Sequence, residues 1–189
     1  MLSKLKTKIA VIAILIMMVA LMAQSTLAYD AVVGNATNVV TAGNIRFAIH
    51  ETTDAGEEFP KEGVSVLPGD TVSKQVSIEN GCEHPFYLRV KIVYGEDSQG
   101  VSVADCFKPE INEAYWELHD GWYYYKGIVK PGETTPDVFS RVEIVGSRVD
   151  NSYLAENLRL TVLAQAVQSE NNPISDGNTY TASGWPIEE

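Results

Sequence analysis

Apolar and polar residues alternate at every second position in several stretches of this chain, and that pattern predicts β-strands. Ile45, Phe47 and Ile49 share one side of residues 45–49, so that face can be buried while the other meets water. Residues 71–80 alternate in the same way, with Lys74 interrupting the apolar row. Long stretches with the spacing of an amphipathic helix are lacking, so the pattern favours an all-β domain.

Further strands are predicted in the second half of the chain. The clearest is 86–93, where every second residue is apolar and Arg89 and Lys91 share the opposite face. Two aromatic segments, 116–118 and 122–126, flank Asp120-Gly121, which predicts a hairpin because glycine tolerates positive φ. Residues 138–145 and 158–167 predict two more strands. Short helical pieces are expected near 104–107 and 151–156.

Two Pro-Gly pairs, Pro68-Gly69 and Pro131-Gly132, each precede a β-prone segment. Proline followed by glycine favours a type II turn. About six to eight strands separated in this way, without helices between them, indicate an antiparallel β-sandwich of jelly-roll type with short helical pieces in its connections. We assign this domain to residues 44–189.

The first residues have the pattern of an export signal. Lys4, Lys6 and Lys8 precede an apolar run of 15 residues, 9–23. A membrane-spanning helix needs about 20 such residues, so a removed signal peptide is favoured over a permanent anchor, and an uncleaved tether is the alternative. We expect the signal peptide to cover residues 1–28, with cleavage between Ala28 and Tyr29 and export from the cell.

The charge of the chain restricts its partners. Without the leader's three lysines, 11 basic and 25 acidic residues remain, a net charge near −14. Such a surface repels nucleic acid and anionic lipid headgroups. We therefore expect no nucleic-acid partner, and contact with a membrane only transiently through the signal peptide.

The two cysteines, Cys82 and Cys106, have two interpretations. In an exported chain they can form a disulfide. They can equally be two separate buried thiols that pack as small apolar residues.

No catalytic or metal-binding motif is present in the sequence. His50, His84 and His119 come from three separate segments without a His-Glu-x-x-His pattern. Neither a Gly-x-Ser-x-Gly elbow nor a phosphate-binding loop occurs. We therefore predict a non-enzymatic protein with no cofactor and no metal site.

The aromatic run 122–125 is the most unusual local feature. In a strand, Trp122 and Tyr124 would share one face and Tyr123 and Tyr125 the other. One pair can then be core while the other is at the surface. Tyr123 and Tyr125 are the candidate surface aromatics for sugar stacking or subunit contact. Packing in the core is the plainer interpretation.

Several motifs together resemble one known family. They are Thr26-Leu27-Ala28-Tyr29, Thr41-Ala42-Gly43-Asn44-Ile45, Leu67-Pro68-Gly69-Asp70-Thr71, His84-Pro85-Phe86-Tyr87-Leu88, Asp120-Gly121-Trp122-Tyr123-Tyr124-Tyr125, Lys130-Pro131-Gly132-Glu133-Thr134 and Gly184-Trp185-Pro186. With them the chain resembles the TasA/camelysin (CalY) family of secreted biofilm matrix proteins, which carry a SipW-type signal peptide.

The resemblance implies a jelly-roll sandwich, export through a dedicated signal peptidase, and fibres built by donor-strand exchange. In that exchange the N-terminal segment of one subunit completes the sheet of the next. The corresponding segment here lies within residues 29–43, with Ala31, Val32, Val33, Val39 and Val40 as candidate assembly residues. Copies of the same chain or related matrix subunits are the implied partners. Gly34 and Asn35 interrupt the segment, so a monomeric secreted relative stays an alternative.

Two other functions are weighed against the matrix subunit. A secreted adhesive or carbohydrate-binding module would need Tyr123 or Tyr125 on an exposed flat face. A camelysin-like metallopeptidase would need a convergent site of histidines and carboxylates, which the sequence spacing does not indicate.

Overall fold

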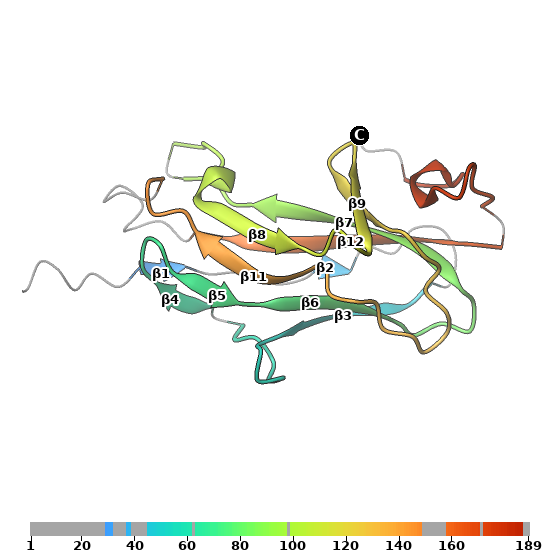
Figure 1. Cartoon of the computed structure of the whole chain (residues 1–189), viewed down its shortest axis with the longest axis horizontal. Helices are drawn as coiled ribbons and strands as arrows, with labels where there is room; N and C mark the ends of the chain where they lie inside the picture. Colours follow the sequence, from blue (N-terminus) through green and yellow to red (C-terminus); the bar gives the residue numbers. More distant parts are fainter. Residues whose placement is uncertain are drawn as a thin grey trace, which may run out of the picture.

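The computed structural model describes residues 29–31, 37–38, 45–61, 63–97, 99–148, 158–170 and 172–186. The chain forms β-strands in layers around a common core (Figure 1). Helix in the described part is confined to two short 3₁₀ turns, η1 (Ala104–Cys106) and η3 (Thr179–Thr181). The predicted all-β antiparallel sandwich is confirmed.

One layer is a five-stranded sheet with the order β2-β12-β7-β10-β9. Its strands are β2 (Thr37–Asn38), β12 (Leu160–Gln168), β7 (Phe86–Tyr94), β10 (Trp122–Tyr125) and β9 (Trp116–His119). β7 and β12 pair antiparallel over nine residues each, from Phe86↔Gln168 to Tyr94↔Leu160. β2 joins the outer side of β12 as a parallel strand.

The facing layer combines two smaller sheets. β3 (Phe47–Thr52) pairs with β6 (Gln75–Asn80), and β11 (Phe139–Ile144) lies between β5 (Thr71–Ser73) and β8 (Phe107–Ile111). The Val138 N–H donates to the Val76 carbonyl at 2.7 Å, and the Lys74 N–H donates to the Ser140 carbonyl at 3.1 Å. These bonds join β6 to the segment that enters β11, so the two sheets continue as one layer.

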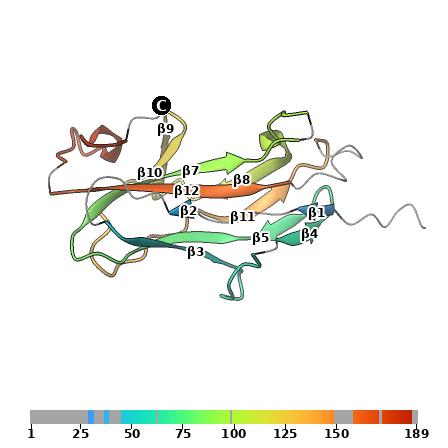
Figure 2. The same ribbon diagram turned by 180° about the vertical axis from the view of Figure 1, so that it is seen from behind.

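A separate pair, β1 (Tyr29–Ala31) with β4 (Val64–Val66), lies at one end of the molecule (Figure 1). The C-terminal segment with η3 lies at the other end, as the opposite view also shows (Figure 2). The long strands run between these two ends.

The core is formed by the inward rows of both layers. In β6, Val76 and Ile78 are fully buried, and in β12 Leu160, Val162 and Ala164 are too. Burial of each large aliphatic side chain contributes roughly 1.5–3 kcal/mol. The alternation seen in the sequence therefore marks the faces that hold the layers together.

Most predicted strands are confirmed. The predictions near 45–49, 71–80, 86–93, 116–118, 122–126, 138–145 and 158–167 correspond to β3, β5 with β6, β7, β9, β10, β11 and β12. The helical piece expected near 104–107 is η1, whereas 151–156 and the expected signal peptide, residues 1–28, lie outside the described residues. β4 and β8 were not predicted, because β4 has three residues and β8 contains Pro109, which weakens a strand signal.

The turns follow the predicted chemistry. Asp120 and Gly121 both have positive φ, 48° and 80°, as a two-residue hairpin turn requires. In the two Pro-Gly turns, Gly69 and Gly132 have φ of 94° and 72°. Asp70 and Glu133 each close the turn with a backbone N–H bond of 3.0 Å to the carbonyl three residues earlier. This is the pattern of a type II turn.

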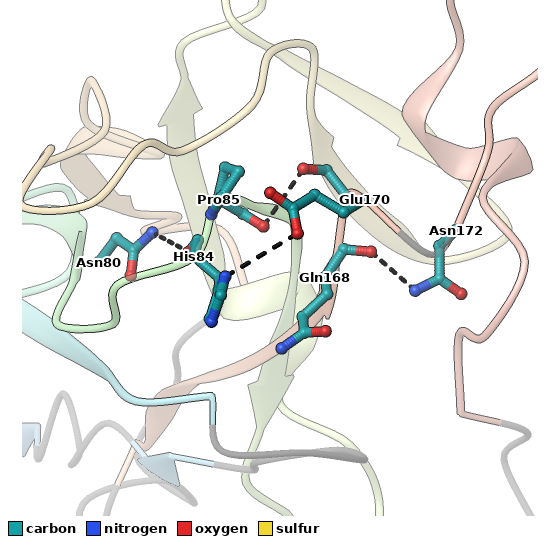
Figure 3. Close-up of polar contacts among 7 residues, drawn as sticks. Asn80, His84, Pro85, Gln168, Glu170 and Asn172 are labelled. Carbon is teal, nitrogen blue, oxygen red and sulfur yellow. Dashed lines mark hydrogen bonds and ion pairs between the residues drawn. The ribbon is translucent and has the colours of Figure 1, made fainter.

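One buried amide connects the loops at the C-terminal end of β6. Asn80 is 1% exposed, and its Nδ2 donates to the carbonyls of His84 at 3.0 Å and Val129 at 2.9 Å. Its Oδ1 accepts the Cys82 N–H at 2.8 Å. Figure 3 shows Asn80 beside His84, where this loop meets the end of β12. The side chain thus fixes three backbone groups.

We predict that Asn80→Ala lowers the free energy of unfolding by about 1–3 kcal/mol, because buried carbonyls and an N–H lose their partners. Urea denaturation measures the change. Gln99→Ala at an exposed position is the control and is expected to stay within about 0.5 kcal/mol of the parent. Equal stability of the two variants would show that the Asn80 bonds contribute nothing.

Candidate functional site

The first described residues of the chain lie as added strands on the rest of the fold. β1 pairs antiparallel with β4, with Tyr29 opposite Val66 and Ala31 opposite Val64. β2 pairs in parallel with β12, with Thr37 opposite Leu163. Backbone hydrogen bonds of this kind are the means by which a strand from any source joins a sheet. The N-terminal segment is therefore the candidate assembly element.

The candidate assembly residues are only partly described. Ala31 lies in β1, and Tyr29, on the C-terminal side of the expected cleavage, begins that strand. Ala28, Val32, Val33, Val39 and Val40 lie outside the described residues. In the single chain, the described parts of the segment pair with the chain's own strands.

Arg89 lies on the outer face of β7, the middle strand of the five-stranded sheet, and it is 6% exposed. Its Nε and Nη2 donate to Gln165 Oε1 at 2.9 and 2.6 Å, and its Nη1 donates to the Tyr124 hydroxyl at 2.9 Å. Nη2 also donates to the Pro186 carbonyl at 2.9 Å. Three segments far apart in sequence thus meet at one guanidinium group.

Aromatic rings complete this arrangement. The Arg89 guanidinium carbon lies 4.2 Å from the centre of the Trp122 ring and 4.9 Å from that of Trp185. Trp185 also packs edge-on against Tyr124 and donates its indole N–H to the Thr179 carbonyl at 3.2 Å. Cation–π contacts and these hydrogen bonds pin the C-terminal segment to the sheet.

The candidate surface aromatics, Tyr123 and Tyr125, do not form an exposed face. Tyr123 and Tyr125 are half-buried and pack against the main core, with the Tyr125 ring 5.4 Å from Trp116. Trp122 and Tyr124 point to the outer face, where the Arg89 contacts bury them. Of the two interpretations of Tyr123 and Tyr125, packing against the core describes this structure, and an exposed flat face of tyrosines does not. Burial also raises the pKa of both Tyr123 and Tyr125.

The histidines do not converge on one site. His50 lies 2.8 Å from Glu79, His119 lies 3.2 Å from Asp120, and His84 lies 3.9 Å from Glu170 (Figure 3). Each pair comes from a different part of the fold. Within the described ranges, no three His, Cys, Asp or Glu side chains gather as metal ligands.

The two cysteines are not joined by a disulfide. The Cys82 sulfur contacts the backbone of Arg46, whereas the buried Cys106 sulfur lies 3.6 Å from the Arg148 carbonyl. They belong to different neighbourhoods, the loop after β6 and the turn η1. The structure therefore has two separate thiols, of which Cys106 is buried and Cys82 is half-buried.

A buried ion pair is the feature that sequence reasoning missed. Lys74 is fully buried, and its Nζ lies 2.8 Å from Glu51 Oε1 and 4.4 Å from the centre of the Phe59 ring. A cavity of about 490 Å³ adjoins it, lined by Ile49, His50, Glu51, Thr52, Glu58, Phe59 and Lys61. The break that Lys74 makes in the apolar row of 71–80 was its only signal in the sequence.

Burial dominates the chemistry of this pair. It raises the pKa of Glu51 and lowers the pKa of Lys74, and the attraction between the two groups offsets part of each shift. Removing a charge from water costs several kcal/mol unless the group is paired or neutral. Both pKa shifts favour the uncharged forms, the carboxylic acid of Glu51 and the neutral amine of Lys74.

We predict that Arg89→Met destabilises the fold by about 1–3 kcal/mol, because the buried Gln165 and Tyr124 oxygens and the half-buried Pro186 carbonyl lose their donor. The tryptophan emission should shift to longer wavelength as Trp185 is released. Arg141→Met, at an exposed position of β11, is the matched control and should leave both stability and emission near the parent values. An unchanged spectrum in Arg89→Met would contradict the pinning of the C-terminal segment.

In the part of the chain that the structure describes, no helix is long and apolar enough to cross a membrane. Comparisons of the chain with protein-family models, with characterised proteins and with solved structures find no match. The functional assignment therefore depends on the motifs and on the geometry of the fold.

Proposed function

We propose that this chain is a secreted structural protein of an extracellular matrix, a relative of the TasA/camelysin proteins that assembles through its N-terminal segment. The motifs that resemble this family support the proposal, and the all-β sandwich is the fold type that the resemblance implies. In this function the sandwich is the scaffold, and residues 29–43 are the exchangeable strand.

The observation that carries the proposal is the position of β1 and β2. Both belong to the N-terminal segment, and both join the rest of the fold by strand pairing, β2 at the outer position of the five-stranded sheet. The same pairings can be made with the segment of a second copy. Exchange of an identical element is a low-cost route to assembly, because the bonds broken are the bonds remade.

The net negative charge of the chain makes assembly depend on the salt concentration. A net charge near −14 after removal of the leader makes copies repel one another. At an ionic strength of 0.15 M, charges are screened beyond about 8 Å. We therefore expect assembly to be favoured by added salt.

The residues on which the carbohydrate-binding and peptidase alternatives depend do not support them. The carbohydrate-binding interpretation needed Tyr123 or Tyr125 on an exposed flat face, and both are half-buried against the core. The peptidase interpretation needed convergent histidines, and His50, His84 and His119 each pair with a different carboxylate. The matrix subunit is the function we retain.

We predict that purified chain beginning at Tyr29 forms fibres at rising concentration, and that a version beginning at Gly43 does not, because it lacks the exchangeable strand. Electron microscopy and light scattering measure the outcome. Fibres from both versions, or monomers from both under all salt conditions, would rule out assembly through this segment.

A matched pair of substitutions separates strand pairing from side-chain effects. Val40→Pro removes a backbone N–H from the segment, whereas Val40→Thr keeps it along with a β-branched side chain. The proline variant should assemble at least several-fold more slowly than the threonine variant. Equal rates would mean that backbone pairing at this position has no part in assembly.

A further inference from the structure

A fully buried lysine beside a carboxylate is the most unusual chemical feature of this sandwich. Glu51 lies on β3, and Lys74 directly precedes β6, the strand that pairs with β3 so that Glu51 is opposite Val76 and Thr52 is opposite Gln75. Lys74 shares the inward row of Val76, and Glu51 that of Phe47 and Ile49. The two side chains therefore meet on the core side, diagonally across the β3–β6 pair.

The backbone fixes both residues. The Lys74 N–H donates to the Ser140 carbonyl at 3.1 Å, and the Glu51 carbonyl accepts the Phe59 N–H at 2.8 Å. The Phe59 ring, itself 6% exposed, lies against the Lys74 Nζ. Among the described residues, Glu51 Oε1 receives no hydrogen bond other than its contact with Lys74. The amine and the carboxyl group are thus held against each other, and the amine is fully buried.

We propose that Lys74 and Glu51 are joined by an intramolecular amide bond between Lys74 Nζ and Glu51 Cδ. The neutral amine attacks Cδ of the protonated carboxyl group, and a C–N bond forms. One C–O bond of the carboxyl group then breaks, and its hydroxyl leaves with one hydrogen of the amine as water. Nothing is oxidised or reduced, and no other reactant is consumed.

The geometry favours this step. With Nζ 2.8 Å from Oε1, the carbon bonded to that oxygen is also at contact distance. Reactants held in such an arrangement reach effective molarities of about 10⁵–10⁸ M. Burial supports the step as well, because it shifts the pKa values of Glu51 and Lys74 toward the acid and amine forms that react.

The adjoining cavity provides an exit for the released water and a nearby carboxylate. Glu51 lines it, so the released water has a route away from the new bond. Glu58 lines the same cavity and carries a carboxylate that can take up a proton and return it. The product would tie β3 covalently to the strand run of β5 and β6, independently of the proposed assembly.

Mass spectrometry of the full chain, in the form that expression and export yield, tests the proposal under denaturing conditions. We expect a mass lower than that of the sequence by one water molecule. Trypsin does not cut after an acylated lysine, so peptides 47–61 and 62–89 should be recovered as one branched species. An ion pair would not survive this treatment.

Two variants provide the controls. Lys74→Arg keeps the charge but should abolish the mass loss, and Glu51→Ala should do the same. A loss of water that persists in Lys74→Arg would point to a cyclised aspartate, as at Asp120-Gly121, and would overturn the proposal. So would recovery of separate peptides 62–74 and 75–89 from the unaltered chain, a result that does not depend on whether either variant folds.

Discussion

The pairing of β7 with β12 is the constraint on which the other features depend. The two strands are hydrogen-bonded over nine residues each, from Phe86 to Tyr94 and from Leu160 to Gln168. Their inward rows supply Leu88, Val90 and Val162 to the core, and all three are fully buried. Because side chains alternate along a strand, the same pairing also fixes what lies on the outer face.

The outer face of this strand pair and the free edge of β12 each hold another part of the chain. The outer face places Arg89 opposite Gln165, so one guanidinium can hold Gln165, Tyr124 and the C-terminal segment together. The free side of β12 receives β2, which brings the N-terminal segment onto the sheet. The same two strands thus position both β2 and the C-terminal segment around Pro186.

The sequence could predict the features that depend on neighbouring residues. The alternation in 86–93 and 158–167, and the Asp120-Gly121 turn, are local signals, and the corresponding strands are observed. Alternation alone could not decide which aromatic pair faces the core, because residues 122–125 are aromatic on both faces. Arg89 was expected on an outward face, and its burial depends on Trp185, which lies far away in sequence. The only sign of Lys74 in the sequence was a break in an apolar row. Its contact with Glu51 depends on how β3 and β6 are aligned, which the sequence pattern does not reveal.

In the proposed assembly, the N-terminal strand of one copy pairs with β12 of another. Solid-state NMR of fibres grown from two differently labelled populations tests it most directly. Strand exchange predicts contacts between residues 37–38 of one population and 163–164 of the other. If these contacts arise only within a single labelled population, the strand stays with its own chain, which would contradict strand exchange.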